Sequence, residues 1–312
     1  MNGQEIRARR AGPTRCPVCD GTCVVSVGPI IHPLPTLIAG VPIDLSDREI
    51  TLWRCADCAF EFKWPPIPED RLLACYGAAA PDHWGEEVGP RERNFDRIAQ
   101  TITRHAKGSR ILDVGCFTGA FLEYLGPGWD RFGVEPNGRA AQIALSRNVQ
   151  VIGETIDHIA LDASYDVVTA MDVVEHIVDP LPFFVRVARF LKPEGILVLT
   201  TGNTESWTWR LQQNRYWYCS YIPEHVSFYQ RRTMLALAAR SGLRSVEQIA
   251  ISHKRAPLRE QVTQAVKGIA FAGGVRLGWL GVPSLRRRFA ERAGTNWIAA
   301  RDHMIHVMRK LA

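Results

Sequence analysis

One run of residues, ILDVGCFTG at positions 111–119, constrains the fold of this chain most. An apolar strand that ends in a glycine turn before a helix is how doubly wound sheets hold adenosine cofactors. In dinucleotide-binding versions the pyrophosphate lies on that turn, and the carboxylate of Asp113 would repel it. The carboxylate instead suits a ligand that carries an ammonium and a sulfonium group. The run therefore favours S-adenosylmethionine over NAD.

The length and composition allow a catalytic domain of about 200 residues with accessory segments. Apolar residues make up 46% of the 312 residues, so a sizeable core is expected. The N-terminus lacks the apolar core of a signal peptide, and no apolar run approaches the about 20 residues that a membrane span needs. We expect a cytoplasmic protein.

Four of the eight cysteines form two short motifs, CPVC and CADC. These are Cys16, Cys19, Cys55 and Cys58. Two such knuckles supply four thiolates at the tetrahedral geometry of zinc, and a closed four-thiolate site leaves no position for a substrate. We therefore predict a structural Zn²⁺ that holds an N-terminal zinc ribbon together.

The chain divides into four predicted segments. Residues 1–68 form the zinc-ribbon module, and residues 69–108 form a helical connector or lid. Residues 109–254 and 301–312 form the core, and residues 255–300 form a basic helical insertion. In the core, strands alternate with helices, which predicts βαβ crossovers. The expected fold is α/β, with a doubly wound, seven-stranded, mostly parallel Rossmann-like sheet.

The insertion carries the excess of basic over acidic residues. From Lys254 to the C-terminus there are 12 Lys or Arg against 3 Asp or Glu. A basic segment can face an anionic membrane, a nucleotide-linked substrate or nucleic acid, but it can also be a solvated helical face. Trp279, Phe289 and Trp297 are interleaved with Arg286–Arg288, a pattern that fits a membrane contact or a helical lid.

Several ordered motifs resemble those of the class I S-adenosylmethionine-dependent methyltransferases. Residues 113–119 are similar to the first motif of that family, with Phe117 where a second glycine is usual. Glu135 stands at the end of the second predicted strand, where the family's acidic residue accepts the ribose hydroxyls. Residues 166–177, DVVTAMDVVEHI, resemble the fourth-strand motif, and residues 191–195, LKPEG, resemble the loop before strand five.

The resemblance implies a cofactor pocket at the carboxyl ends of these strands. Asp113 and Glu135 would bind rather than react, because methyl transfer is an in-line displacement at an already activated carbon. Gly115 and Gly119 would allow close backbone approach to the cofactor. The predicted cofactor-binding residues are Asp113, Gly115, Cys116, Phe117, Gly119, Glu135, Pro136, Met171 and Asp172.

A narrower resemblance comes from the knuckles together with residues 223–229, PEHVSFY. Both are similar to zinc-ribbon methyltransferases of bacterial sugar and polysaccharide pathways, some of which are deoxysugar C-methyltransferases. In those enzymes a Tyr, a Glu and a His handle protons at the sugar ring. Glu224 and His225 match, whereas Ile222 occupies the usual position of the Tyr and Tyr221 lies one residue earlier. O-methylation therefore stays open beside C-methylation.

Histidine is the predicted general base, because its unperturbed pKa lies near working pH. We predict His225 as the base and Glu224 as its catalytic companion, with His176 as a further contact to substrate or cofactor. Side chains of consecutive residues usually diverge, so neither histidine need contact the glutamate that precedes it.

These patterns predict a methyltransferase that acts on a small molecule, and we favour a sugar, a nucleotide sugar or a glycolipid. One alternative is an RNA or protein methyltransferase that docks through the zinc module and the basic tail, although the ribbon is not basic enough to favour nucleic acid. Another is a scaffold that binds the cofactor without catalysis, which the presence of Asp113 and Glu135 disfavours. Peripheral membrane contact through the insertion is also open.

Overall fold

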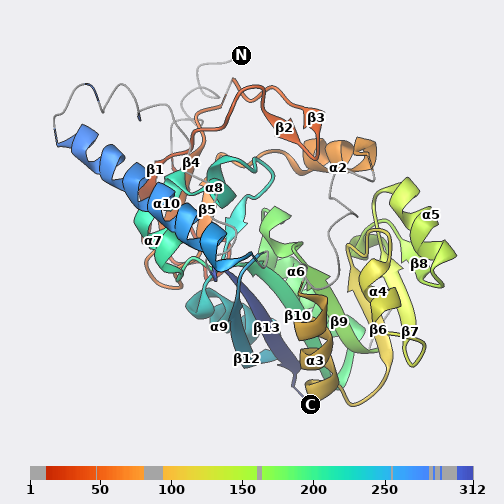
Figure 1. Ribbon diagram of the computed structural model, residues 1–312. Helices are drawn as coiled ribbons and strands as arrows, with labels where there is room; N and C mark the ends of the chain where they lie inside the picture. The colour runs from red at the N-terminus through yellow and green to blue at the C-terminus, as the bar shows by residue number, and fades with distance from the viewer. Residues whose placement is uncertain are drawn as a thin grey trace, which may run out of the picture.

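The computed structural model describes residues 12–46, 48–80, 94–159, 164–253, 256–280 and 301–311, together with Ser284 and Phe289. A large twisted sheet forms the centre of the molecule, and a smaller antiparallel sheet lies beside it (Figure 1). In the basic insertion, Arg286–Arg288 and Trp297, for which a membrane contact or a helical lid was expected, lie outside the described residues. Among the described residues, no helix is both long enough and apolar enough to cross a membrane.

The large sheet has seven strands in the order β12-β13-β10-β9-β6-β7-β8. All neighbouring pairs among β10, β9, β6, β7 and β8 are parallel, and β13 runs antiparallel to both β10 and β12. This confirms the predicted mostly parallel α/β sheet. Its strands are β6 (Arg110–Val114), β7 (Asp130–Val134), β8 (Gln150–Gly153), β9 (Tyr165–Met171), β10 (Leu191–Gly202), β12 (Leu243–Ile251) and β13 (His303–Lys310).

Helices cover both faces of this sheet. Short 3-10 turns interrupt several connections. The helices are α2 (Glu69–Ala78), α3 (Phe95–His105), α4 (Ala120–Tyr124), α5 (Gly138–Ser146), α6 (Pro180–Phe190), α7 (Trp207–Gln212), α8 (Trp217–Ser220), α9 (Arg231–Arg240) and α10 (Leu258–Trp279). The 3-10 turns are η1 (Ile156–His158), η2 (Val174–His176) and η3 (Gln213–Arg215).

Alternate residues of the parallel strands pack on opposite faces of the sheet. In β6, Leu112 belongs to a core cluster with residues of α6 and α9, whereas Ile111 belongs to a cluster with residues of α3, α4 and α5. The predicted start of α5 at Asn137 is also found in the structure. The side chain of Asn137 caps α5 by accepting hydrogen bonds from the backbone N–H groups of Arg139 and Ala140.

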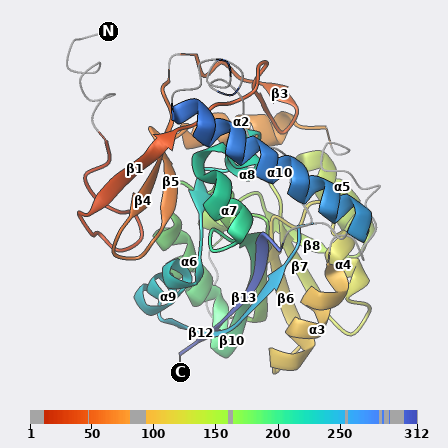
Figure 2. The same cartoon turned by 60° about the vertical axis from the view of Figure 1, so that its left-hand side comes forward.

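The smaller sheet joins the N-terminal segment to the core. Its strand order is β1-β4-β5-β11, and β1, β4 and β5 lie side by side in Figure 2. The fourth strand, β11, comes from the connection that leads into α9. Its strands are β1 (Val24–Pro29), β4 (Thr51–Cys55), β5 (Glu61–Trp64) and β11 (Ser227–Phe228), and a separate hairpin consists of β2 (Leu37–Ile38) and β3 (Val41–Pro42). Because β5 pairs with β11, the N-terminal segment shares backbone hydrogen bonds with residues that follow His225.

Candidate active site

Asp113 lies near the carboxyl end of β6, where the strand order reverses between β6 and β9. Its side chain is buried, and one carboxyl oxygen accepts a 2.6 Å hydrogen bond from the Thr169 hydroxyl. The other oxygen is buried without a hydrogen-bond partner in the part of the chain that the structure describes. A buried acceptor without a donor costs free energy, so a cationic ligand beside it would supply a missing partner.

The turn after β6 has the backbone shape of a ligand cradle. Gly115 has a φ of +73°, and a Cβ there would approach Cγ2 of Val173 to 2.8 Å. Phe117 also has a positive φ, +48°, although a non-glycine residue pays about 1–2 kcal/mol for that conformation. Its backbone N–H donates to Oε2 of Glu135 at 2.9 Å, which helps to hold the turn in this shape.

Glu135 follows β7 and lies beside the same turn. Its second carboxyl oxygen, Oε1, accepts a 2.8 Å hydrogen bond from the backbone N–H of Asn137. Two backbone donors therefore orient the carboxylate, and each oxygen keeps a second lone pair for a ligand hydroxyl. Burial raises the pKa of Glu135, and these two N–H groups oppose the rise. The geometry fits the ribose-binding role that the sequence predicts for this residue.

Asp172 lies directly after β9, at the same edge of the sheet. It has a φ of +53°, and its Oδ1 accepts a 2.9 Å hydrogen bond from the Thr200 hydroxyl. The strand ends of β6, β7 and β9 therefore present three carboxylates, those of Asp113, Glu135 and Asp172, toward one edge. The carboxyl edge at the reversal of strand order is the usual ligand position in such sheets.

A second group of side chains joins η2 to the segment before β11. The His176 and His225 rings lie 4.8 Å apart, centroid to centroid, in an edge-to-face arrangement. Nδ1 of His176 lies 2.7 Å from the hydroxyl of Tyr76, which belongs to α2. Asn137 donates to the backbone carbonyls of Tyr76 and Ala79, so α2 is tied to both the cofactor cradle and the histidines.

The hydrogen bonding of His225 assigns its tautomer. Its Nδ1 lies 3.1 Å from the backbone carbonyl of Tyr218, which can only accept, so Nδ1 carries the proton. Burial lowers the pKa of His225 well below its usual value, and the neighbouring His176 and Lys63 lower it further. The imidazole is therefore neutral, and Nε2 is a lone-pair acceptor. A neutral imidazole can accept a proton, but its lowered pKa makes it a weaker base than the unperturbed histidine on which the sequence prediction relied.

Glu175 is a buried residue whose role sequence reasoning missed. Its carboxylate accepts hydrogen bonds from the Tyr218 hydroxyl at 2.5 Å and the Thr201 hydroxyl at 2.9 Å. Its backbone carbonyl accepts the N–H of Val226, next to His225. Burial raises the pKa of Glu175 to about 7, and Asp172 contributes to the rise. Glu175 thus connects β10, α8 and the residue after the candidate base.

Glu224, the other predicted catalytic residue, is buried but faces the N-terminal segment. Its Oε1 accepts a 3.3 Å hydrogen bond from the backbone N–H of Ala39, in the turn between β2 and β3. Its Oε2 has no partner among the described residues and is buried. Burial raises the pKa of Glu224. This second oxygen is available to accept a hydrogen bond from a ligand hydroxyl.

Lys63 of β5 is a second residue that the sequence did not reveal. Its ammonium is buried and donates to the backbone carbonyls of Ile222 and Pro223, both at 3.1 Å. Its backbone N–H donates to the carbonyl of Val226 at 2.9 Å. Burial lowers the pKa of Lys63 to about 8. One side chain of the small sheet therefore holds the segment that carries Glu224 and His225.

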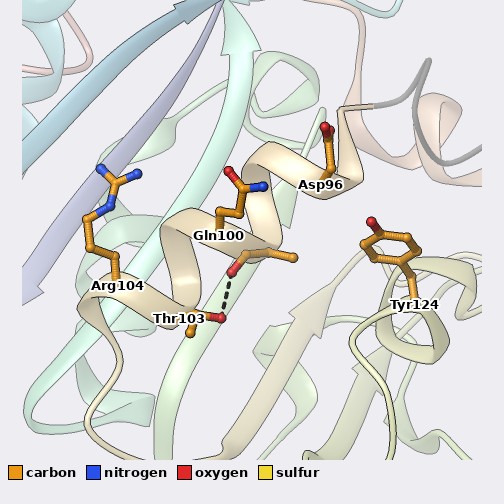
Figure 3. A pocket seen from close by; sticks show the side chains of 6 residues that line it. Asp96, Gln100, Thr103, Arg104 and Tyr124 are labelled. Atoms are coloured by element: carbon orange, nitrogen blue, oxygen red, sulfur yellow. Dashed lines mark hydrogen bonds between the residues drawn. The ribbon is translucent and has the colours of Figure 1, made fainter.

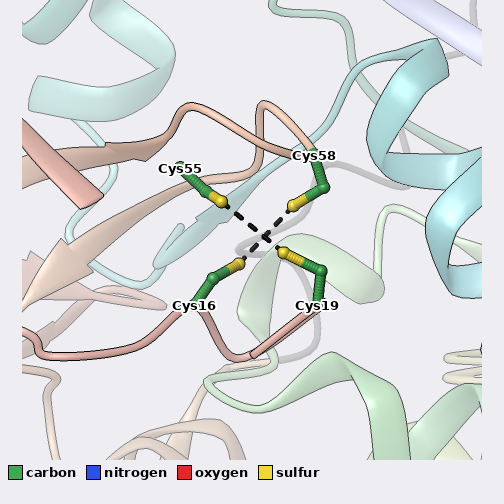
Figure 4. Close-up of side chains that lie close together, drawn as sticks. All are labelled: Cys16, Cys19, Cys55 and Cys58. Atoms are coloured by element: carbon green, nitrogen blue, oxygen red, sulfur yellow. Dashed lines mark hydrogen bonds between the residues drawn. The ribbon is translucent and has the colours of Figure 1, made fainter. Parts of the chain in front are cut away.

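The four knuckle cysteines converge (Figure 4). The Sγ atoms of Cys16 and Cys58 are 3.5 Å apart, and those of Cys19 and Cys55 are 3.6 Å apart. Around a zinc ion with Zn–S bonds of about 2.3 Å, tetrahedral sulfur atoms would lie about 3.8 Å apart. All four offer one ligand atom within 4.8 Å of the others. The arrangement fits four-thiolate coordination.

The aromatic residues after β10 form a mostly buried cluster that contacts His225 through Tyr218. Trp209, Tyr216, Trp217 and Tyr218 are buried, whereas Trp207 is half exposed. The Tyr218 and His225 rings are 4.1 Å apart, and Nε1 of Trp209 donates to Glu61 of β5 at 3.0 Å.

A separate hollow lies beside α3 and the end of α4 (Figure 3). It is lined by Asp96, Ala99, Gln100, Thr103, Arg104 and Tyr124. It contains none of the predicted site residues, and we assign it no role.

A family model described as a methyltransferase domain matches residues 87–248, more than half of the chain. The match includes the strand ends that carry Asp113, Glu135 and Asp172, and also the segment that carries Glu224 and His225.

Curated relatives share part of this region. A ubiquinone biosynthesis O-methyltransferase of Bradyrhizobium diazoefficiens is 36% identical over 118 residues, which are 36% of this chain and 46% of that protein. One of Rhodopseudomonas palustris strain BisA53 is 27% identical over 172 residues, 48% of this chain and 67% of that protein. The chain thus spans about half of the first relative's length.

A solved structure shows the same fold. A Haloferax volcanii complex, of the Trm112 methyltransferase activator with a protein described as a methyltransferase, has a TM-score of 0.53 at 17% identity. The similarity covers 77% of this chain and 98% of the matched chain.

Proposed function

The chain belongs to the methyltransferase-domain family, and from this premise we propose that it methylates a hydroxyl group of a small molecule with S-adenosylmethionine. The observation that carries the proposal is the placement of His225: the Tyr218 carbonyl holds its Nδ1–H, which leaves Nε2 as the lone-pair nitrogen, and its ring packs on His176 in the turn that follows β9. S-adenosylmethionine, when bound, supplies a methyl group on an activated carbon.

The residues of the cofactor edge match the groups of this cofactor. We propose that the unpartnered oxygen of Asp113 faces its cationic part and that Glu135 accepts its ribose hydroxyls. Gly115 and Gly119, with φ values of +73° and +74°, allow the backbone to approach it closely. Cys116, Phe117, Pro136 and Met171 remain predicted contacts.

The proton is handled by the histidine pair in this proposal. The bound cofactor would supply the methyl group, and Nε2 of His225 would take the proton of the hydroxyl that receives it. The Tyr218 carbonyl then stabilises the protonated imidazole through the Nδ1–H hydrogen bond. His176 and Glu224 would orient the acceptor beside this base.

Acceptor chemistry favours oxygen over carbon. The matched relatives are named O-methyltransferases, and their names do not support the predicted sugar acceptor. Tyr221 is half exposed, so it does not complete the Tyr, Glu and His set of the deoxysugar C-methyltransferases. We propose a hydroxyl-bearing small molecule and keep a sugar as one member of that class.

We also propose that Cys16, Cys19, Cys55 and Cys58 hold a structural zinc ion. Support comes from the convergence of their sulfur atoms and from the packing of this segment against α9. The Cys58 carbonyl accepts a hydrogen bond from the Thr233 hydroxyl, and the Ala59 carbonyl accepts one from Gln230. The zinc would therefore stabilise the packing of the N-terminal segment against α9.

A transfer assay tests the proposed function. Methyl-labelled S-adenosylmethionine is incubated with the full chain and with nucleotide sugars, glycolipids or polyprenyl phenols, and NMR of each product locates the methyl group. Transfer to a hydroxyl supports the proposal. Transfer only to RNA or protein would favour the docking alternative, and cofactor binding without transfer to any acceptor would favour the scaffold.

Cofactor affinity should depend on pH because burial raises the pKa of Asp113 to about 7. The ionised carboxylate attracts a cationic ligand and the protonated form does not. We therefore expect S-adenosylmethionine affinity to be constant above pH 7 and to fall by up to about tenfold per pH unit below it. Calorimetric titration from pH 5.5 to 8.5 measures this. The Asp113→Asn variant should lose the pH dependence, and an unchanged profile in that variant would exclude Asp113 as its source.

A further inference from the structure

The helix α10 is apolar on two sides, and among the described residues one side is buried while the other is exposed. The packed side consists of Gly268, Phe271, Ala272, Gly274 and Gly278, which are buried. Six large apolar side chains on the helix and at its end are exposed: Leu258 (74%), Val262 (53%), Val266 (61%), Ile269 (55%), Leu277 (49%) and Leu280 (80%). We call these six residues the α10 stripe.

The spacing of the α10 stripe places its members on one side of the helix. Successive residues of an α-helix are about 100° apart, so these positions fall within a sector of about 100°. Single exposed apolar residues are common on soluble proteins, but six on one side of a helix, interrupted only at Gly273, mark an interaction surface.

The charges around the stripe identify its partner. Arg259, Lys267 and Arg276 are exposed on α10, whereas Glu260 is the only acidic residue in this helix. By position on the helix, Arg276 and Arg259 border the stripe on its two sides. An apolar row flanked by cationic side chains is typical of helices that lie in the interface of an anionic bilayer.

The helix also lies close to the substrate side of the molecule. It packs along α7, in the connection after β10 (Figures 1 and 2). Ala265 of α10 packs against the aromatic cluster that contains Trp209, Trp217 and Tyr218. A surface bound to α10 would therefore lie next to the aromatic cluster whose Tyr218 packs against His225.

From this stripe and its charges we infer that α10 docks on anionic lipid bilayers, with its six apolar side chains in the interface and its cations at the headgroups. The protein would bind peripherally, since no described helix can span the bilayer. This inference goes beyond the proposed function and does not depend on it, because docking requires neither cofactor nor acceptor.

Vesicle co-sedimentation of the full chain tests the inference. We expect binding to vesicles of phosphatidylglycerol and phosphatidylcholine, and much weaker binding to pure phosphatidylcholine or at high salt. The double substitution Val266→Glu and Ile269→Glu should lower the affinity by about tenfold or more, because two buried apolar side chains are lost from the interface. Arg259→Gln with Arg276→Gln should remove the preference for anionic vesicles.

Matched control variants distinguish docking through α10 from nonspecific hydrophobic adsorption to vesicles. Val185→Glu on α6 and Leu235→Glu on α9 replace exposed apolar residues elsewhere, and they should leave vesicle binding unchanged. Absence of wild-type binding to anionic vesicles, or equal losses in stripe and control variants, would overturn the inference. A dimer in sedimentation velocity that the stripe substitutions dissociate would show instead that the stripe binds a second copy of the chain.

Discussion

Replacing His225 with Gln should lower kcat for methyl transfer by about 10²–10⁴-fold, the usual contribution of a general base. The amide N–H of Gln can still donate a hydrogen bond to the Tyr218 carbonyl. Gln has no basic nitrogen, however, to take the proton from the substrate hydroxyl. The dissociation constant for S-adenosylmethionine should change little, because the proposed contacts to the cofactor are made by Asp113 and Glu135 and not by His225. Steady-state kinetics and calorimetry measure the two effects separately.

His306→Gln is the matched control for this experiment. His306 is also a buried imidazole, and burial lowers its pKa to about 4, but it lies on β13 with Ser245 and Gln248 as partners. Its loss should affect the melting temperature and not kcat. Equal kcat losses in the two variants would indicate general destabilisation, and full activity of His225→Gln would remove this residue from the mechanism.

Loss of the proposed zinc should have the second large effect. Zinc binding contributes about 10 kcal/mol or more to the folding of small four-ligand modules. The Cys58→Ser substitution should therefore release the metal, lower the melting temperature and disorder β5. Because Lys63 of β5 holds the carbonyls of Ile222 and Pro223, His225 would move, and displacements of about 1 Å can cost 10²-fold in rate.

The measurements for this variant are zinc content, thermal unfolding and kcat. Cys23→Ser is the control, since Cys23 is exposed and lies outside the four-cysteine cluster. It should retain about one zinc per chain and full activity. Retention of wild-type kcat in a Cys58→Ser protein without zinc would separate the ribbon from catalysis.

The core fold was predictable because its signals are local. Each buried strand is a short apolar run, and each βαβ unit follows from strand and helix alternation. Asp113 and Glu135 were predictable for the same reason, since both stand at strand ends that a motif locates. The CxxC spacing likewise placed four cysteines that the structure brings together.

The part of the candidate site that is proposed to bind the substrate depends on contacts between segments that are distant in the sequence. No local pattern indicates that Lys63 reaches residues 222–226, that Tyr76 meets His176, or that Glu175 binds Tyr218. The resemblance named Glu224 and His225 as a set without giving their partners, and in the structure the hydrogen bond of Glu224 goes to Ala39 and that of His225 goes to Tyr218. Tertiary packing decides which partner each side chain has.

Calorimetric titration of S-adenosylmethionine into three proteins tests the central claim most directly, that Asp113 holds the cofactor while His225 acts only on the proton. At pH 8 we predict equal affinity for wild type and His225→Gln, and at least about tenfold weaker binding by Asp113→Asn, from the loss of a charged hydrogen-bond partner. No binding by the wild type, or undiminished binding by Asp113→Asn, would contradict the account.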